Sequence, residues 1–453
     1  MFTQILQDEY ASQVELEDCL NMAEPIVDPK LGIVKRVSEI PPYPGEPSFI
    51  RYTAVLSNID RIFDCPTFSP IAGGASIYQK EAKMKALGEA IERYCAFIRF
   101  DNELIYASYE ELGQAALDPN DLPMCSDKEY SNPRNYLVKP RRDVKMRWSR
   151  GFSLTRRREL LVPANLVYLS HKYSMREEMI NLPISTGLAC GPNIFEALIS
   201  GLCEVVERDA FTVTWYHQLP VPKLDVTQVS DENITERLMR LEKAELEPFF
   251  FNITTEIQIP SILLILVSKS QTVPVLTVTT ATHPDPYRAL TKVIDEGVST
   301  RNFCIGMLRK GYISKVSVTN PSEFTHLEDH LFAYVHPEML GNFDFLLKNP
   351  ISMSFRELPN LSNHNLAVTL KDILAIFSNL NMEVIAVDIT TEDIKEAGFT
   401  VLRVLIPGLE PLSQDHNIRF LGRTRLYELP KYMGYDSKIR YESYITKLPH
   451  PFA

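Results

Sequence analysis

Two short segments of the chain space their charged residues in a way that could hold a metal ion. They read Glu89-Ala-Ile-Glu92-Arg93 and Glu204-Val-Val-Glu207-Arg208. Carboxylates at positions i and i+3 lie on one face of an α-helix. Mg²⁺ takes oxygen ligands, commonly one or two carboxylates, and leaves its other positions to phosphate and water. Two such helices facing each other could hold Mg²⁺ against a triphosphate, with the arginines meeting phosphate or steering the carboxylates.

Either segment alone also has an ordinary explanation, because a polar helix face is usually solvated and supported by a pair such as Glu89–Arg93. Runs of small residues precede both segments, at 72–76 and 185–191. Small residues let backbone amides approach an anion at a helix N-terminus, although the second run equally fits a turn. Walker A and Rossmann fingerprints are absent from the sequence, so a nucleotide site here would be of another kind.

A third segment, residues 286–303, predicts a helix in which Arg301 continues the apolar stripe of Leu290, Ile294 and Gly297. A buried arginine needs a partner, and phosphate or a structural carboxylate would serve equally. The nine histidines form no catalytic triad or metal spacing. His326 and His330 are predicted to lie at the surface.

The remaining pattern predicts the elements that must position these residues. Apolar periodicity indicates helices over 79–100 and 194–215, and β-branched runs indicate strands over 262–267, 273–280, 383–390 and 399–406. Mixed helices and strands without clean alternation indicate an α/β (mixed α+β) fold. We expect a proline-rich lead-in over 1–50 and one domain over 51–453. Residues 139–158 are strongly basic, which fits a solvated hairpin or a dock for an acidic peptide.

The composition excludes several classes of protein. The formal net charge of −11 argues against a nucleic-acid-binding protein. Seven scattered cysteines without a C-x-x-C pair signal neither zinc nor a redox dithiol and fit a reducing compartment. The longest apolar run, 261–267, is too short to span a membrane, and the first residues do not form a secretory signal. We therefore expect a cytoplasmic protein that binds no membrane.

Several motifs together resemble the YcaO superfamily. Residues 196–210 closely resemble its central motif, residues 85–94 its first ATP-site helix, residues 285–301 its third helix, and residues 404–412 and 421–425 its C-terminal motifs. The resemblance implies a YcaO-type fold with the ATP site between helices in a central cleft. It also implies ATP and Mg²⁺ as cofactors. The implied Mg²⁺ ligands are Glu89, Glu92, Glu204 and Glu207, and the implied nucleotide contacts are Lys85, Arg93, Glu196, Arg208 and Arg301.

The chain closes on Leu-Pro-His-Pro-Phe-Ala (448–453), which resembles the proline-rich tail of the azoline-forming branch. That branch uses ATP to activate a peptide oxygen while a Cys, Ser or Thr side chain attacks the preceding carbonyl. The prolines favour an extended course, which would bring the Ala453 carboxylate to the reaction centre as a proton acceptor. His450 is the other titratable group in reach. A frayed tail is the ordinary alternative.

The resemblance also implies partners and leaves alternatives open. The implied partners are a ribosomal precursor peptide, an E1-like or winged-helix protein that binds its leader, and a flavin-dependent azoline dehydrogenase; we expect a homodimer. Thr186, Pro192, Ser299, Ala75 and Ala453 depart from the family pattern. The alternatives are therefore thioamide or amidine formation at the same ATP site, or a silent docking or scaffold subunit.

Overall fold

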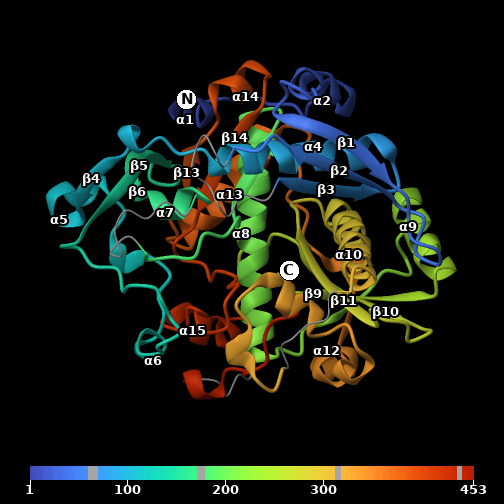
Figure 1. Ribbon diagram of the computed structural model, residues 1–453. Helices are drawn as coiled ribbons and strands as arrows, with labels where there is room; N and C mark the ends of the chain where they lie inside the picture. Colours follow the sequence, from blue (N-terminus) through green and yellow to red (C-terminus); the bar gives the residue numbers. More distant parts are fainter. Residues whose placement is uncertain (60–69, 171–178, 312–317, 436–440, 453) are drawn as a thin grey trace.

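The computed structural model describes residues 1–59, 70–170, 179–311, 318–435 and 441–452. Helix α8 (Ile194–His217) runs through the centre of the molecule (Figure 1), and side chains on almost all of its faces are buried. Such a helix needs structure around it on every side. It begins at Asn193, whose side chain accepts a hydrogen bond from the Glu196 amide at 2.9 Å.

The sheet on one side of α8 is antiparallel, in the order β4-β5-β13-β14-β7, with β6 also paired to β5. Strands β14 and β7 and helix α13 pack against α8. The bounds are β4 (Ile105–Ser108), β5 (Lys145–Ser153), β6 (Arg158–Pro163), β7 (Leu188–Gly191), β13 (Ile385–Asp388), β14 (Thr400–Leu405) and α13 (Leu366–Asn379).

A second sheet lies on the other side of α8, in the order β11-β10-β9-β8-β12. Its strand β11 contacts α8, while α10 packs on β10 and β11 and α9 packs on α10. The bounds are β8 (Lys223–Asp225), β9 (Leu246–Asn252), β10 (Ser261–Ser268), β11 (Leu276–Thr282), β12 (Ser352–Ser354), α9 (Glu232–Lys243) and α10 (Pro286–Arg309).

The third sheet, β1 (Val34–Ile40), β2 (Ile50–Leu56) and β3 (Ile71–Ser76), carries α4 (Gln79–Phe97), and α2 (Leu16–Ala23) packs on α4. Strand β1 belongs to the predicted lead-in and pairs with β2, so the sheet crosses the expected boundary at residue 50. The small-residue run lets β3 approach α4 closely, because a Cβ on Gly74 would lie 2.3 Å from the Ala82 carbonyl oxygen.

Short helices complete the described chain, and no helix in these residues is both long and apolar enough to cross a membrane. They are α1 (Phe2–Ile5), α5 (Tyr109–Leu112), α6 (Asp127–Tyr130), α7 (Ala164–Val167), α11 (Leu327–Phe332), α12 (Asp344–Leu347), α14 (Glu392–Glu396) and α15 (Thr424–Tyr432). In the described residues there are also eight 3₁₀ helices of three to seven residues: Glu24–Ile26, Asp101–Glu103, Gly113–Ala115, Pro119–Asp121, Pro321–Glu323, Pro337–Phe343, Phe355–Glu357 and Glu442–Tyr444.

The predicted mixed fold and its main elements are confirmed. Helices α4, α8 and α10 match the three predicted helices, and β10, β11, β13 and β14 match the four predicted strands. The basic segment contributes the β5–β6 hairpin. Several of its cations pair with acids from elsewhere in the chain, as in Arg142–Asp118 and Lys145–Glu111. This neutralisation favours the solvated hairpin over a dock for an acidic peptide.

One prediction about the histidines is wrong. His330 is 1% exposed rather than at the surface, and its ring stacks on that of His450 with 4.0 Å between the centroids. Sequence patterning missed this because the partner ring lies 120 residues away, in the C-terminal tail.

Arg301 pairs with a structural carboxylate, which is one of the two partners that the sequence left open. Its Nε and Nη2 lie 2.7 and 3.0 Å from the two carboxylate oxygens of Glu46, and its Nη1 donates to the Pro274 carbonyl. The side chain is 2% exposed. All its donor nitrogens are thus used within the protein, and the pair ties the N-terminal segment to α10. A phosphate contact by Arg301, as the family resemblance implied, is not supported by this geometry.

We predict that Arg301→Ala lowers stability far more than ATP affinity. Removing one partner of a buried ion pair leaves Glu46 uncompensated and costs about 3–5 kcal/mol. Thermal melting and calorimetric titration with an ATP analogue and Mg²⁺ would be measured on the same preparation. A variant that melts like the parent but binds the nucleotide much more weakly would contradict this assignment.

Candidate functional site

The first carboxylates of the site lie on α4, facing the glycine run of β3. Glu89 accepts a hydrogen bond from the Gly73 amide at 2.7 Å through Oε2. Its Oε1 accepts from Arg93 Nε at 3.0 Å and Nη2 at 2.6 Å. The amide that sequence analysis offered to an external anion is therefore used by the chain's own carboxylate, and Arg93 steers that carboxylate.

Glu92 links the two predicted helices. Burial raises the pKa of Glu92 well above its usual range, and the nearby carboxylates of Glu204 and Glu89 raise it further. Glu92 on α4 therefore lies within electrostatic range of Glu204 on α8, and both helices pack against β7 and β14. A carboxylate in such a position holds a proton tightly unless a cation replaces it.

Glu204 and Glu207 on α8 are held by backbone amides and by Arg208. Glu204 accepts from the Gly187 amide at 3.1 Å, and Glu207, which is 1% exposed, accepts from the Thr282 amide at 3.0 Å. Arg208 Nη2 and Nη1 lie 3.4 Å from oxygens of Glu204 and Glu207, respectively. The carboxylates are thus fixed in direction, and the Arg208 guanidinium lies beside both.

Helix α10 supplies two residues that sequence analysis missed. Lys292 Nζ lies 3.6 Å from Glu207 and 3.7 Å from Glu296. Burial alone would lower the pKa of Lys292, but the carboxylates of Glu207, Glu296 and Glu204 outweigh it and raise the pKa. Burial raises the pKa of Glu296 to about 7, although Lys292 opposes the shift. The available signal was their i, i+4 spacing on the polar face of α10, opposite the stripe that contains Arg301.

Arg403 on β14 is the other missed residue. It is 4% exposed, and its Nη1 donates to the Ile184 carbonyl at 2.8 Å. Burial lowers its pKa to about 10, while the carboxylates of Glu204 and Glu92 oppose that shift. Its position inside an apolar, β-branched strand concealed it, since strand patterning alone cannot distinguish a core position from a site.

The remaining predicted nucleotide contacts lie around this cluster. Lys85 Nζ lies 2.7 Å from Asp295, which Arg237 also holds at 2.7 Å. Glu196, at the first turn of α8, accepts from the Val14 amide and from Asn193, each at 2.9 Å. Glu196 and Lys292 both line a cleft of about 600 Å³, which is within the usual range for a small-molecule site. Arg301 lies outside the cleft wall, in its pair with Glu46.

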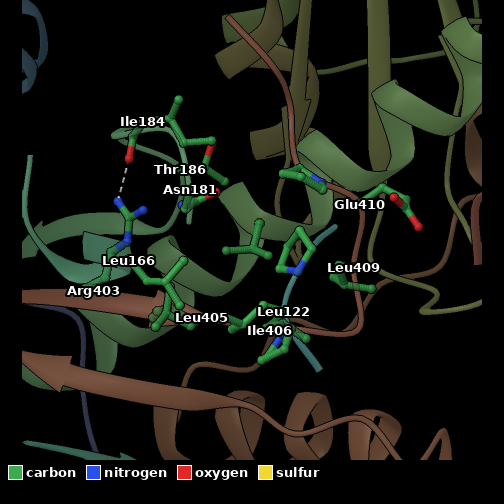
Figure 2. A pocket seen from close by; sticks show the side chains of 15 residues that line it. Leu122, Leu166, Asn181, Ile184, Thr186, Arg403, Leu405, Ile406, Leu409 and Glu410 are labelled. Atoms are coloured by element: carbon green, nitrogen blue, oxygen red, sulfur yellow. Dashed lines mark hydrogen bonds between the residues drawn. The ribbon is translucent and has the colours of Figure 1, made fainter. Parts of the chain in front are cut away.

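A smaller cavity of about 70 Å³ lies on a different face of α8, and Figure 2 shows its mainly apolar wall. Val205 lines this cavity, whereas Ser200 and Cys203 line the larger cleft. Successive helical residues are 100° apart, so Glu204 projects between the two faces. Arg403 and Thr186 add polar groups to the small cavity (Figure 2). Glu204 therefore projects between the larger cleft and the small, mainly apolar cavity.

The C-terminal tail reaches this cluster. Its carbonyl groups at Leu448, Pro449 and His450 accept hydrogen bonds from Trp215, Tyr334 and His330, respectively. The Phe452 ring lies under Arg208, with the guanidinium carbon 4.3 Å from the ring centroid. The tail is therefore docked through Phe452 instead of frayed, while Ala453 lies outside the described residues.

His450 does not have the geometry of a free base. Its Nε2 bonds to the Ser413 carbonyl, and its Nδ1 accepts from the Phe452 amide at 3.3 Å. Burial lowers its pKa to about 4, which keeps the ring neutral near pH 7. Both ring nitrogens are occupied, so the ring anchors the tail, and the expected catalytic role of His450 is not supported.

The donor set fits Mg²⁺ and a polyphosphate, although the site is not preassembled. In the part of the chain described, no three His, Cys, Asp or Glu side chains are placed to hold a metal ion as they stand. Glu89, Glu204 and Glu207 instead face amides and cations. Arg208 Nη1 and Arg403 Nε are buried without a hydrogen-bond partner among the described residues. Carboxylate oxygens suit Mg²⁺, and unused guanidinium groups suit phosphate.

Solved structures with the same fold are known. The chain aligns with a heterocyclase solved in complex with substrate and cofactor (TM-score 0.81, 21% identity), covering 98% of this chain and 59% of the heterocyclase. It also aligns with YcaO from Methanopyrus kandleri bound with AMPPCP and Mg²⁺ (TM-score 0.62, 19% identity), covering 88% of this chain and 92% of the Methanopyrus protein. A third similar structure is a chain of the Escherichia coli microcin synthetase McbBCD complex with pro-MccB17 bound (TM-score 0.61, 15% identity). The alignment covers 92% of this chain and 96% of that one. At these identities the likeness concerns the fold.

The family follows from the sequence itself. The model of the family described as "YcaO cyclodehydratase, ATP-ad Mg2+-binding" matches residues 73–410, which include helices α4, α8 and α10 and Arg403. ATP and Mg²⁺ are thus the cofactors, and the carboxylates and cations of α4, α8 and α10 are of the kinds that bind Mg²⁺ and phosphate. The chain belongs to the YcaO family.

Proposed function

We propose that the chain is an ATP-dependent cyclodehydratase that converts Cys, Ser or Thr of a ribosomal precursor peptide to thiazoline or oxazoline. The observation that carries this proposal is the meeting of four elements at one place: the carboxylates of α4, α8 and α10 and the docked C-terminal tail, which touches Arg208. The heterocyclase with bound substrate and cofactor supports it through a shared fold.

In this proposal Glu89, Glu92, Glu204 and Glu207 hold Mg²⁺. Lys85, Arg93, Glu196 and Arg208 serve the nucleotide, by contact or by holding the metal ligands in place. Lys292 and Arg403 join this set because they lie beside the same carboxylates. When bound, ATP supplies the phosphoryl group that turns the peptide oxygen into a leaving group. We assign the large cleft to the nucleotide, because its wall includes Glu196 and Lys292.

The peptide then approaches from the side of the small cavity and the tail. The substrate thiol or hydroxyl attacks the preceding carbonyl carbon, a C–S or C–O bond forms, and the former carbonyl oxygen leaves with the phosphate. The attacking group and the amide nitrogen each lose a proton, and the carboxylate of Ala453 is proposed to accept the first. Preorganised cations such as Arg403 would stabilise negative charge that develops there.

The tail favours azoline formation over thioamide or amidine formation, which would use the same ATP site. A silent scaffold is the other alternative, based on Thr186, Pro192 and Ser299. Thr186 and Pro192 line the small cavity and the large cleft, whereas every proposed metal carboxylate is present, which favours turnover. The precursor peptide, an E1-like or winged-helix leader-binding protein, a flavin-dependent azoline dehydrogenase and a second copy of the chain remain the proposed partners.

We predict that Glu207→Gln abolishes ATP turnover and leaves the fold intact. The amide oxygen can still accept from Thr282, but a neutral amide is a poor Mg²⁺ ligand. Phosphate release and circular dichroism would be compared with the parent and with Glu81→Gln. Glu81 lies on the same helix as Glu89 and bonds to Ser76, so its variant should keep turnover. A Glu207→Gln enzyme within about tenfold of the parent, or about 1.4 kcal/mol, would reject the metal role.

A second prediction separates azoline chemistry from ATP binding. A short Gly-Ser tag placed after Ala453 moves the terminal carboxylate away while leaving Phe452 in place. Heterocycle formation, followed as a loss of about 18 Da (one water) per ring, should collapse, because the terminal carboxylate can no longer act as a general base. ATP affinity should stay near that of the parent. Cyclisation of the cognate peptide at the parent's rate would show that the carboxylate has no catalytic role.

A further inference from the structure

The aromatic ring of Phe452 is placed where it can control an arginine of the ATP site. The ring is buried, 4% exposed, between the Arg208 guanidinium on one side and the Phe211 ring on another, whose centroid is 5.0 Å away. A guanidinium within about 6 Å of a ring centroid is attracted to the aromatic face, more strongly when both are shielded from water. The contact joins the last described residue of the chain to the centre of α8.

The other contacts of Arg208 are too long to define its position by themselves. Its nitrogens lie 3.4 Å from Glu204 and 3.4 Å from Glu207, whereas charge-assisted N–H···O bonds are usually 2.7–2.9 Å long. The structural pairs in the same molecule are shorter, with 2.7 Å for Arg301–Glu46 and 2.6 Å for Arg425–Asp209. The ring therefore supplies a third constraint on Arg208, and it leaves Nη1 without a hydrogen-bond partner among the described residues.

The tail that carries Phe452 is itself firmly held. Three successive carbonyl groups, at Leu448, Pro449 and His450, each accept a hydrogen bond from a buried aromatic or imidazole side chain. The His450 ring adds a bond to the Ser413 carbonyl and a stack with His330. This anchoring fixes the backbone immediately before Phe452, so the docked tail determines where the ring lies.

We propose that Phe452 is a positioning residue that holds the Arg208 guanidinium between Glu204 and Glu207, so that Nη1, which makes no hydrogen bond among the described residues, can donate to a phosphate oxygen. Docking of the tail is then coupled to ATP binding, in addition to the role proposed for the terminal carboxylate. The structure assigns the tail two separable effects, one through Phe452 on the nucleotide and one beyond it on the peptide. This inference rests on the proposed ATP site.

The test compares two Phe→Leu variants of the full-length chain. Phe452→Leu removes the aromatic face but keeps an apolar side chain, and we expect it to weaken binding of Mg²⁺ and a non-hydrolysable ATP analogue roughly tenfold. Phe343→Leu is the matched control, because Phe343 is fully buried in the same hydrophobic cluster, with its ring centroid 5.4 Å from that of Trp215. The control should lower the melting temperature to a similar extent and leave the affinity of the analogue within about twofold of the parent.

Rescue and failure are both measurable. Phe452→Tyr keeps the aromatic face and should restore the parent affinity within about twofold. Should Phe452→Leu fail to fold, Phe452→Met, which is flexible and of similar volume, carries the same prediction. Equal analogue affinities for Phe452→Leu and Phe343→Leu would overturn the inference. That outcome is distinct from failure of the proposed function, in which Glu207→Gln would retain turnover.

Discussion

The concentration of carboxylates between three helices is the constraint on which the rest of the structure depends. Burial raises the pKa of a carboxyl group and nearby carboxylates raise it further, as Glu204 and Glu89 do for Glu92 and Glu207 does for Glu296. The chain offsets this charge with Arg93, Arg208, Lys292 and Arg403 and with backbone amides of Gly73, Gly187 and Thr282. These cations and amides offset the negative charge of the site, a role that Mg²⁺ would share when bound.

The three sheets serve to bring these charges together. Strand β3 presents Gly73 to α4, β7 and β14 close one side of α8, and β11 brings Thr280 and Thr282 to Glu207 from the other. Close packing is needed at each junction. At Gly187, for example, a Cβ would lie 2.2 Å from the Val404 carbonyl oxygen. The small-residue runs are thus explained by backbone approach, and that approach places amides against carboxylates.

Sequence reasoning recovered the elements whose signals are local. Apolar residues at helical spacing predicted the helices α4, α8 and α10, and the two Glu-x-x-Glu-Arg segments placed the proposed metal ligands on α4 and α8. It could not choose a partner for Arg301, because Glu46 lies 255 residues away. The burial of His330 was missed for the same reason, since its partner ring lies in the C-terminal tail, whereas Arg403 was missed because it lies inside an apolar strand. Local patterns indicate which residues can do chemistry, and only tertiary contacts show which are already engaged within the protein.

The most direct test of the account is a crystal structure of the chain with Mn²⁺ in place of Mg²⁺ and a non-hydrolysable ATP analogue. The account predicts anomalous peaks among Glu89, Glu92, Glu204 and Glu207, phosphate oxygens against Arg208 and Lys292, and an unchanged Arg301–Glu46 pair. Metal ions bound away from these four carboxylates, or phosphates paired with Arg301, would contradict it.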